Sequence, residues 1–289
     1  MQSQKPKIFD LDNNFSSKIN SSNFKAISLK EILFYKYLIY MLIKKEFVVF
    51  YKQTVLGPFW YVLQPIINTI VFTIVFGKIA KIPTNGVPDF IFFMSGQIIW
   101  AYFAMNLQSS ANIFVTNASL FKKIYFPRIV VPISTIIFNL NNLLIQISIF
   151  FCFFIYFILN GSDLSFGIHL LYLPLVIINC MFLSLGFGLF FSSLTSKYRD
   201  FQYLLSFGVQ LWMFLTPVIY SLSTIPEKYL FYFYINPMSS IVETFRWVIF
   251  QNVELNFNLI VANLVISILL FIFGYLKFNK VEKNFVDTV

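Results

Sequence analysis

Charged side chains are scarce in this chain of 289 residues. Asp, Glu, Lys and Arg make up 11% of the sequence, whereas a soluble domain carries about 25%. Hydrophobic residues account for 58% and aromatic residues for 20%, which is more apolar surface than a soluble core of this length can bury. These proportions exclude a soluble enzyme, a disulfide-stapled secreted domain and a disordered tail. They indicate a membrane protein.

Residues that bind metals or form disulfides are also few. The two cysteines, Cys152 and Cys180, both lie in apolar stretches, where they act as small hydrophobic side chains. The single histidine, His169, has no cluster of acids or cysteines beside it in the sequence. We therefore predict no metal site and no catalytic residue.

The sequence also lacks the phosphate-binding loop G-x-x-x-x-G-K-[ST]. Before Gly77-Lys78, the position that needs a glycine is occupied by Phe72. We therefore do not expect the chain itself to bind ATP or Mg²⁺. Ion-coupled transporters place ionisable residues inside the bilayer, and intramembrane enzymes need acids, histidines or metal ligands there. The membrane spans predicted below contain none, which argues against ion coupling and against an intramembrane enzyme, so any energy the chain uses must come from elsewhere.

Six stretches without a charged residue or histidine are long enough to cross about 30 Å of hydrocarbon as helices. Apolar residues cover all their faces, unlike the alternating pattern of a transmembrane β-barrel. The predicted spans are 59–77, 90–115, 129–159, 170–194, 201–221 and 257–276. The sequence thus predicts an all-α membrane protein with six transmembrane helices.

The positive charges are distributed unevenly over the connections between these spans. With a cytoplasmic N-terminus, 17 of the 21 Lys and Arg residues lie on the inner side, which has a net charge of +10 against −1 outside. Positive loops remain in the cytoplasm, so we predict a multi-pass protein of the inner (cytoplasmic) membrane with both termini cytoplasmic. The total charge of +9 therefore indicates orientation rather than nucleic-acid binding.

The polar N-terminal segment 1–29 has no apolar core of a signal peptide, and we expect a disordered cytoplasmic lead-in there. The membrane domain is predicted over 30–280 and a cytoplasmic tail over 281–289. Within the domain, 32–43 is apolar but too short to span. Two interpretations of it remain open: an interfacial helix on the inner leaflet, or a helix packed against the bundle.

The connection 222–256 is far longer than two adjacent helices need. It contains two short apolar pieces separated by Asn236-Pro237, a helix stop, and neither piece can cross a bilayer alone. We expect a re-entrant helical hairpin on the outer side, between the fifth and sixth spans, with its charged residues, Glu243 and Arg246 among them, at its ends. Such a hairpin would belong to a pathway or gate, and a simple surface cap is the alternative.

The third predicted span carries Asn139, Asn142 and Gln146 on one helical face. Amides buried in a bilayer need hydrogen-bond partners, which a neighbouring helix or a polar conduit would supply. Both interpretations remain open.

The inner connection between the second and third spans combines basic and large apolar side chains. Asn117 or Ser119 can cap a short helix that Pro127 would stop. A solvated basic loop would not need Leu120, Phe121 and Tyr125, so we interpret this segment as a helix that docks into a groove of another protein. A helix lying on the membrane surface is the alternative.

Five segments, in a fixed order, resemble the permease subunits of ABC-type polysaccharide exporters, the membrane halves that export O-antigen, teichoic acid and related lipid-linked glycans. The resemblance covers about residues 30–280. The segments are YKQTVLGPFWYVLQP (51–65), KIYFPR (123–128), KYRDF (197–201), TPVIY (216–220) and NPM (236–238).

This resemblance implies a homodimer of six-span chains that pairs with two copies of a separate P-loop ATPase, which binds ATP and Mg²⁺. The loop helix over 117–126 would be the coupling helix seated in that ATPase, with a second contact after the fourth span, and the hairpin would close the outer end of the channel. The implied coupling residues are Asn117, Leu120, Phe121, Lys122, Lys123, Tyr125, Arg128, Lys197, Arg199 and Asp200.

The resemblance further implies a conduit lined by aromatic and neutral polar side chains, since sugar rings stack on aromatic rings. The lining candidates are Trp60, Tyr61, Gln64, Gln210, Trp212 and Tyr220. Ordinary packing or a place in the interfacial aromatic belt is the alternative for each. A lipid-pyrophosphate headgroup would need cations at the cytoplasmic entrance, for which Lys44, Lys45 and Lys52 are candidates, although positive-inside topology also explains them.

We therefore expect the membrane-spanning permease of an ATP-driven exporter that moves a lipid-linked, O-antigen-like polysaccharide across the cytoplasmic membrane. The chain would be a transport subunit and not an enzyme, because the partner hydrolyses ATP. The alternatives are an integral-membrane transferase acting on a lipid-linked glycan, and an ABC permease for a small lipid or drug.

Overall fold

The computed structural model describes residues 29–53, 55, 57–124, 126–251 and 257–288. This described part of the chain consists of helices and their connections, without a β-strand, which confirms the all-α class. Apart from Leu29, the predicted disordered lead-in lies outside the described residues, and so does the predicted coupling residue Tyr125.

Five helical segments are long and apolar enough to cross a membrane, and they correspond to five of the six predicted spans. The first combines α3 with a π-helical continuation, η2, and the fourth begins with a short 3-10 helix, η3. The elements are α3 (Trp60–Phe72) with η2 (Thr73–Ile79), α4 (Asp89–Ala111), α7 (Val130–Leu159), η3 (Ile168–Tyr172) with α8 (Leu173–Thr195), and α12 (Phe257–Thr288).

The predicted span 201–221 is not one helix. Its helix, α9 (Phe201–Phe214), has 14 residues, which rise about 21 Å and cannot cross the hydrocarbon alone. The chain turns before Pro217, because a proline disfavours helical geometry at the residue that precedes it. The prediction of an uninterrupted helix to 221 is therefore wrong, and a turn segment of residues 215–221 follows α9.

Two short helices, α10 (Glu227–Ile235) and α11 (Pro237–Phe250), occupy the long connection, after the 3-10 turn η4 (Leu222–Thr224). They separate at Asn236, as predicted, and the Asn236 Oδ1 atom caps α11 by accepting a hydrogen bond from the Met238 N–H. Most residues of α11 are buried, and the helix packs against α4, α8 and α12. A simple surface cap does not describe α11.

The N-terminal helices are α1 (Leu29–Phe34) and the longer α2 (Lys36–Gln53). One side of α2 packs against α7, where the Phe47 ring meets Phe138 edge-on at 5.0 Å. Tyr37 and Tyr40 remain exposed. Packing against the bundle is therefore observed for α2, while its location at a membrane surface stays a prediction.

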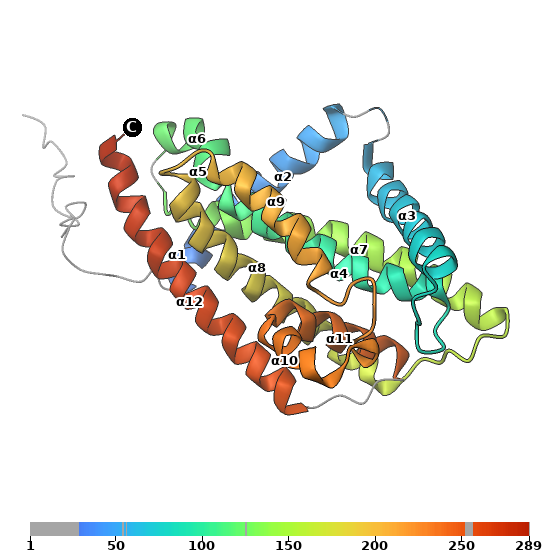
Figure 1. Ribbon diagram of the computed structural model, residues 1–289. Helices are drawn as coiled ribbons and strands as arrows, with labels where there is room; N and C mark the ends of the chain where they lie inside the picture. Colours follow the sequence, from blue (N-terminus) through green and yellow to red (C-terminus); the bar gives the residue numbers. More distant parts are fainter. Residues whose placement is uncertain (1–28, 54, 56, 125, 252–256, 289) are drawn as a thin grey trace, which may run out of the picture.

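The bundle has two distinct ends (Figure 1). The short helices α5 (Ile113–Thr116) and α6 (Ala118–Lys123) lie at one end with the C-terminal part of α12, and we call this the loop-helix end. The opposite end, which holds α10 and α11, is the hairpin end. A buried cluster at the loop-helix end contains Leu42 of α2 and Phe278 of α12, so both described ends of the chain meet there.

Helices α8 and α12 cross with their backbones in contact at Gly186 and Gly274. A Cβ atom added at Gly274 would lie 2.1 Å from the carbonyl oxygen of Gly186, and one added at Gly186 would lie 2.7 Å from the Leu270 backbone. Small residues allow this close approach between membrane helices, and any larger side chain would force the helices apart.

We expect Gly274→Val to lower the free energy of unfolding by about 3 kcal/mol, because the new side chain must displace the α8 backbone. The measurement is the thermal unfolding midpoint of the purified protein in detergent. Gly208→Ala is the matched control, since a Cβ at Gly208 of α9 meets open space, and its midpoint should stay close to that of the wild type. A wild-type midpoint for Gly274→Val would contradict the crossing.

Candidate functional site

The connection between α4 and α7 forms an elbow at the loop-helix end, which comprises α5, α6 and the residues up to Arg128. The backbone becomes extended at Ile124, where α6 ends. Asn117 stands at the N-terminal cap position of α6, but its side chain does not cap that helix. Its Nδ2 donates instead to the Thr116 hydroxyl at 3.0 Å and to the Ile113 carbonyl at 3.4 Å.

The side chains of Phe121 and Arg128 point into the chain's own core. Phe121 is 9% exposed and packs between the rings of Phe114 and Phe126. The Arg128 guanidinium lies 5.3 Å from the centre of the Phe121 ring. The Arg128 N–H donates to Glu282 Oε1 at 3.0 Å, and Arg128 Nη1 donates to the Glu282 carbonyl oxygen at 3.3 Å. We call these two bonds the Arg128–Glu282 clasp.

The burial of Phe121 corrects the expectation that its ring is presented to a partner protein. An aromatic side chain in a basic loop can pack either into an external groove or into the chain's own core, and here the ring lies in a buried cluster to which α12 contributes Phe278. Lys123 and Ile124 of the elbow are exposed, and the exposed fraction of Ile124 is 51%. Leu120 is half-buried. Lys122 belongs to α6.

The predicted second contact lies at the same end of the bundle. The Thr195 hydroxyl, at the end of α8, donates to the carbonyl oxygen of Ala111 at the end of α4. The connection from α8 to α9 therefore begins beside the elbow. Its charged side chains Lys197, Arg199 and Asp200 are all exposed.

The proposed headgroup residues lie on α2. Lys44, Lys45 and Lys52 are all exposed. The Lys45 Nζ atom lies 3.9 Å from Glu46 Oε1, in an exposed pair of the kind that contributes little stability. These lysines are thus accessible to an anion.

Five of the six predicted conduit residues form two groups on two helices, and the sixth, Tyr220, lies in the turn segment 215–221. Trp60, Tyr61 and Gln64 lie on α3, which packs against α4 and α7, whereas Gln210 and Trp212 lie on α9, which packs against α4 and α8. Because α4 lies between the two helices, one copy of the chain does not bring both groups onto a single path. The side chains of Trp60, Gln64 and Gln210 are exposed.

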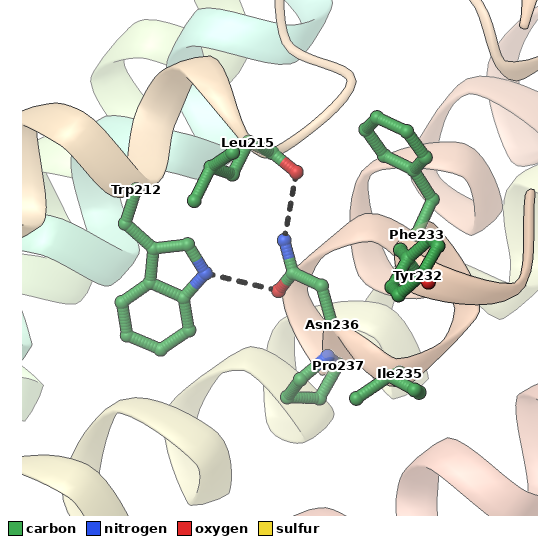
Figure 2. Close-up of a pocket in the computed structure, with 7 residues that line it drawn as sticks. All are labelled: Trp212, Leu215, Tyr232, Phe233, Ile235, Asn236 and Pro237. Atoms are coloured by element: carbon green, nitrogen blue, oxygen red, sulfur yellow. Dashed lines mark hydrogen bonds between the residues drawn. The ribbon is translucent and has the colours of Figure 1, made fainter. Parts of the chain in front are cut away.

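Trp212 borders a pocket of about 270 Å³ at the hairpin end. Its Nε1 donates to Asn236 Oδ1 at 3.0 Å, and Asn236 Nδ2 donates to the Leu215 carbonyl oxygen at 3.1 Å (Figure 2). These bonds tie the end of α9 to the break between α10 and α11. The pocket is lined by Trp212, Leu215, Tyr232, Phe233, Ile235, Asn236 and Pro237.

The turn segment after α9 is held by Arg246 of α11. Arg246 Nη1 donates to the carbonyl oxygens of Pro217, at 2.6 Å, and Tyr220, at 3.0 Å, and Nη2 donates to that of Val218, at 2.7 Å. Turn carbonyls lack the partners that a helix provides, and the guanidinium supplies donors in a fixed fork. The Tyr220 hydroxyl donates to the Phe214 carbonyl oxygen at 2.8 Å and closes the turn.

Glu243 completes this arrangement from one turn earlier on α11. Its Oε1 lies 3.4 Å from Arg246 Nη1, and the guanidinium carbon lies 3.8 Å from the centre of the Phe92 ring of α4. Gly96 of α4 makes room for the group, because a Cβ there would lie 2.5 Å from the Val218 carbonyl oxygen. The prediction that Glu243 and Arg246 lie at the hairpin ends is wrong, since both are buried in the bundle. Their spacing of three residues in an apolar helix is the signal that could have identified the pair.

The amides of the third predicted span serve helix packing. Asn139 Nδ2 donates to Asn106 Oδ1 of α4 at 2.8 Å. Gln146 Nε2 donates to Asn142 Oδ1 at 3.2 Å, and Asn142 Nδ2 lies 3.8 Å from the Met105 sulfur. Asn139, Asn142 and Gln146 are buried between α7 and its neighbours, so the packing interpretation is the one observed.

A second amide pair, which the sequence analysis did not identify, connects α12 with the hairpin end. Asn263 Nδ2 donates to the Pro237 carbonyl oxygen at 2.7 Å, and Asn179 Nδ2 of α8 donates to Asn263 Oδ1 at 2.9 Å. We call this pair of bonds the Asn263 tie. It reaches the first residue of α11.

Within the described residues, no three His, Cys, Asp or Glu side chains gather in a group that could hold a metal ion. The His169 ring packs on Trp247, with 4.3 Å between ring centres. Cys152 is exposed, Cys180 is buried, and both are free thiols.

We expect Arg246→Met to destabilise the fold by about 3–5 kcal/mol, because it leaves Glu243 buried without its cation and three carbonyl oxygens without donors. Thermal unfolding in detergent measures the loss. Lys228→Met, which removes an exposed cation from the adjacent α10, is the control and should have little effect. A double variant, Arg246→Met with Glu243→Met, should recover part of the loss. Equal midpoints for Arg246→Met and Lys228→Met would contradict the assigned role.

Comparison with known proteins adds independent findings. Residues 37–250 match the model of the ABC-2 type transporter family. The O-antigen export system permease protein RfbA of Klebsiella pneumoniae is 28% identical over 265 residues, which cover 91% of this chain and 99% of that protein. A protein of the same name from Myxococcus xanthus is 23% identical over 268 residues, covering 90% and 98%. The polysialic acid transport protein KpsM of Escherichia coli is 26% identical over 192 residues, covering 66% and 72%.

Proposed function

This chain belongs to the family of ABC-2 type transporters, and on that premise we propose that it is the permease of an ATP-driven exporter that moves a lipid-linked polysaccharide of the O-antigen type out of the cytoplasm. The observation that carries the proposal is the similarity to O-antigen export permeases along nearly the whole length of both chains. The loop-helix end and the hairpin end therefore both have counterparts in those permeases.

A separate P-loop ATPase, in two copies that bind ATP and Mg²⁺, is the energy source in this proposal. The elbow supports it, because Phe121 and Arg128 fix the elbow to the bundle while Lys123 and Ile124 face outward. Together with the exposed charges after α8, these side chains form one surface on which an ATPase can dock. Asn117, Leu120 and Lys122 complete the proposed coupling helix.

The proposed topology has six crossings, with both termini in the cytoplasm. The turn segment 215–221 extends α9 toward the hairpin end and completes the fifth crossing, and α12 is the sixth. The shared cluster of α2 and α12 at the loop-helix end supports placing both described chain ends on one side. The pair α10–α11 then forms a re-entrant hairpin that closes the outer end of the path.

A homodimer supplies the conduit in this proposal. Helix α9 exposes the large apolar side chains of Leu204, Phe207 and Leu211, and in the most hydrophobic part of the α3 and η2 span 17% of the residues are buried. A second copy would cover such surfaces and bring the polar and aromatic residues of α3 and α9 onto a common path. The lysines of α2 lie at the entrance, where a lipid-pyrophosphate headgroup would arrive.

Reconstitution tests the transport activity. We expect proteoliposomes that contain the chain and its ATPase to move a lipid-linked polysaccharide in an ATP-dependent manner, because the chain itself has no P-loop. An ATPase variant that cannot hydrolyse ATP is the control. Transport of a short lipid or a drug but not of the glycan would favour the small-substrate permease. Glycan modification without any partner would favour the transferase.

Substitution of Ile124 tests the docking surface. We expect Ile124→Asp to lower the amount of ATPase that co-purifies with the chain by about tenfold, because it places a charge in an apolar contact. Ile168→Asp changes the same residue type at the opposite, hairpin end and should leave co-purification unchanged. Normal ATPase recovery with Ile124→Asp would refute docking through the elbow.

A further inference from the structure

An exporter driven from one face of the membrane must transmit movement to the other face. Helix α12 runs from the elbow to the hairpin (Figure 1). Glu282 lies 19 positions after Asn263, a rise of about 28 Å along this helix, which is close to the thickness of the hydrocarbon. A continuous helix over that distance is a stiff element, so its two ends move together.

At the loop-helix end, α12 contacts the elbow through hydrogen bonds and through aromatic packing. The Arg128–Glu282 clasp joins them through two hydrogen bonds, one of which uses the Arg128 backbone. One turn earlier, the fully buried Phe278 ring stacks on Phe114 of α5, with 5.0 Å between ring centres. Any displacement of the elbow is therefore passed to α12.

At the other end of α12, the Asn263 tie joins this helix to the start of α11, because Asn263 Nδ2 donates to the Pro237 carbonyl oxygen. Pro237 directly follows Asn236, whose side chain bonds to the end of α9. Arg246, further along α11, holds the turn segment 215–221. A movement of α12 would therefore act on α11 and the turn segment as one unit.

The surroundings of α12 allow such a movement. In the membrane-length apolar stretch of α4, 78% of the residues are buried. In the corresponding stretch of α12, 22% of the residues are buried. Helix α4 is thus enclosed, and shifting it would require repacking on all sides. Helix α12 instead packs against α8, and their backbones touch at the Gly186–Gly274 crossing. The ring pairs Phe182–Phe271 and Phe190–Phe273 lie on either side of this backbone contact. A contact of this kind can act as a pivot.

We propose that α12 transmits the ATPase-driven movement of the elbow to the hairpin, with Glu282 and Asn263 as the positioning residues at its two ends and the Gly186–Gly274 crossing as its pivot. This inference rests on the proposed function, because it requires an ATPase docked at the elbow. It adds a mechanical path between the two ends of the bundle.

The test uses a reporter on the hairpin in the complete complex with the ATPase. Phe231 of α10 is 68% exposed, so Phe231→Cys in a Cys152→Ser background provides an accessible thiol, whereas Cys180 is buried. The measurement is the rate of maleimide labelling without nucleotide and with ATP plus vanadate. We expect nucleotide to change this rate by about fivefold.

Asn263→Leu should abolish the nucleotide-dependent change in labelling, because leucine has a similar volume but cannot form the tie. ATP hydrolysis should persist while glycan export falls about tenfold. The matched control is Asn141→Leu, since the Asn141 amide bonds only to carbonyl oxygens of its own helix, Ile137 and Phe138, among the described contacts. The control should keep both the labelling change and export.

A second pair of variants probes the clasp independently. Glu282→Ala removes the acceptor for the Arg128 N–H and should also abolish the labelling change, whereas Glu282→Gln retains an acceptor and should restore it. A purely structural role would lower complex yield and ATP hydrolysis along with export, and it would not produce this pattern of loss and rescue.

Three results would overturn the inference while leaving the proposed function intact. They are a wild-type labelling response in Asn263→Leu, a wild-type response in Glu282→Ala, and the absence of any nucleotide response in a wild-type complex that exports glycan. If the wild-type complex neither exports glycan nor hydrolyses ATP in response to it, the proposed function itself fails.

Discussion

The architecture of the hairpin end depends on the hydrogen bonds that Arg246 makes to the turn after α9. A helix that ends inside a membrane-sized bundle leaves carbonyl oxygens that water cannot reach, and each unpaired carbonyl costs free energy. One guanidinium satisfies three of them from a neighbouring helix. The cost is a buried cation, which Glu243 offsets and which the Phe92 ring and Gly96 accommodate.

This arrangement explains why a chain with so few charges buries two of them together. The break after α9 requires donors, arginine provides several in a fixed plane, and a carboxylate balances its charge. The Asn236 side chain also satisfies backbone groups at helix ends, because its amide pairs with the Leu215 carbonyl oxygen and the Met238 N–H. It also accepts a hydrogen bond from the Trp212 side chain. The hairpin end is thus held by polar side chains that complete interrupted backbones, whereas the rest of the bundle is packed mainly by apolar and aromatic side chains.

The sequence was informative where local chemistry decides the structure. Long uncharged stretches identified five membrane-length helices, and Asn236-Pro237 identified the break between α10 and α11. The sequence was misleading where segments far apart in the chain determine which side chains are buried. Phe121 is buried in a cluster to which α12, more than 150 residues later in the chain, contributes Phe278, and Arg246 is buried because α9 ends early. No local pattern around Phe121 distinguishes an aromatic residue that packs inside the chain from one that packs against a partner.

The dependence of the elbow on α12 also has a consequence for the order of assembly. During synthesis the elbow leaves the ribosome long before Phe278 and Glu282, which are its packing partners in the last helix. An unfinished chain therefore presents Phe114 and Arg128 without these partners, and the elbow reaches its final shape only after α12 has inserted. A partner protein that recognises the finished elbow would therefore bind only chains whose synthesis is complete.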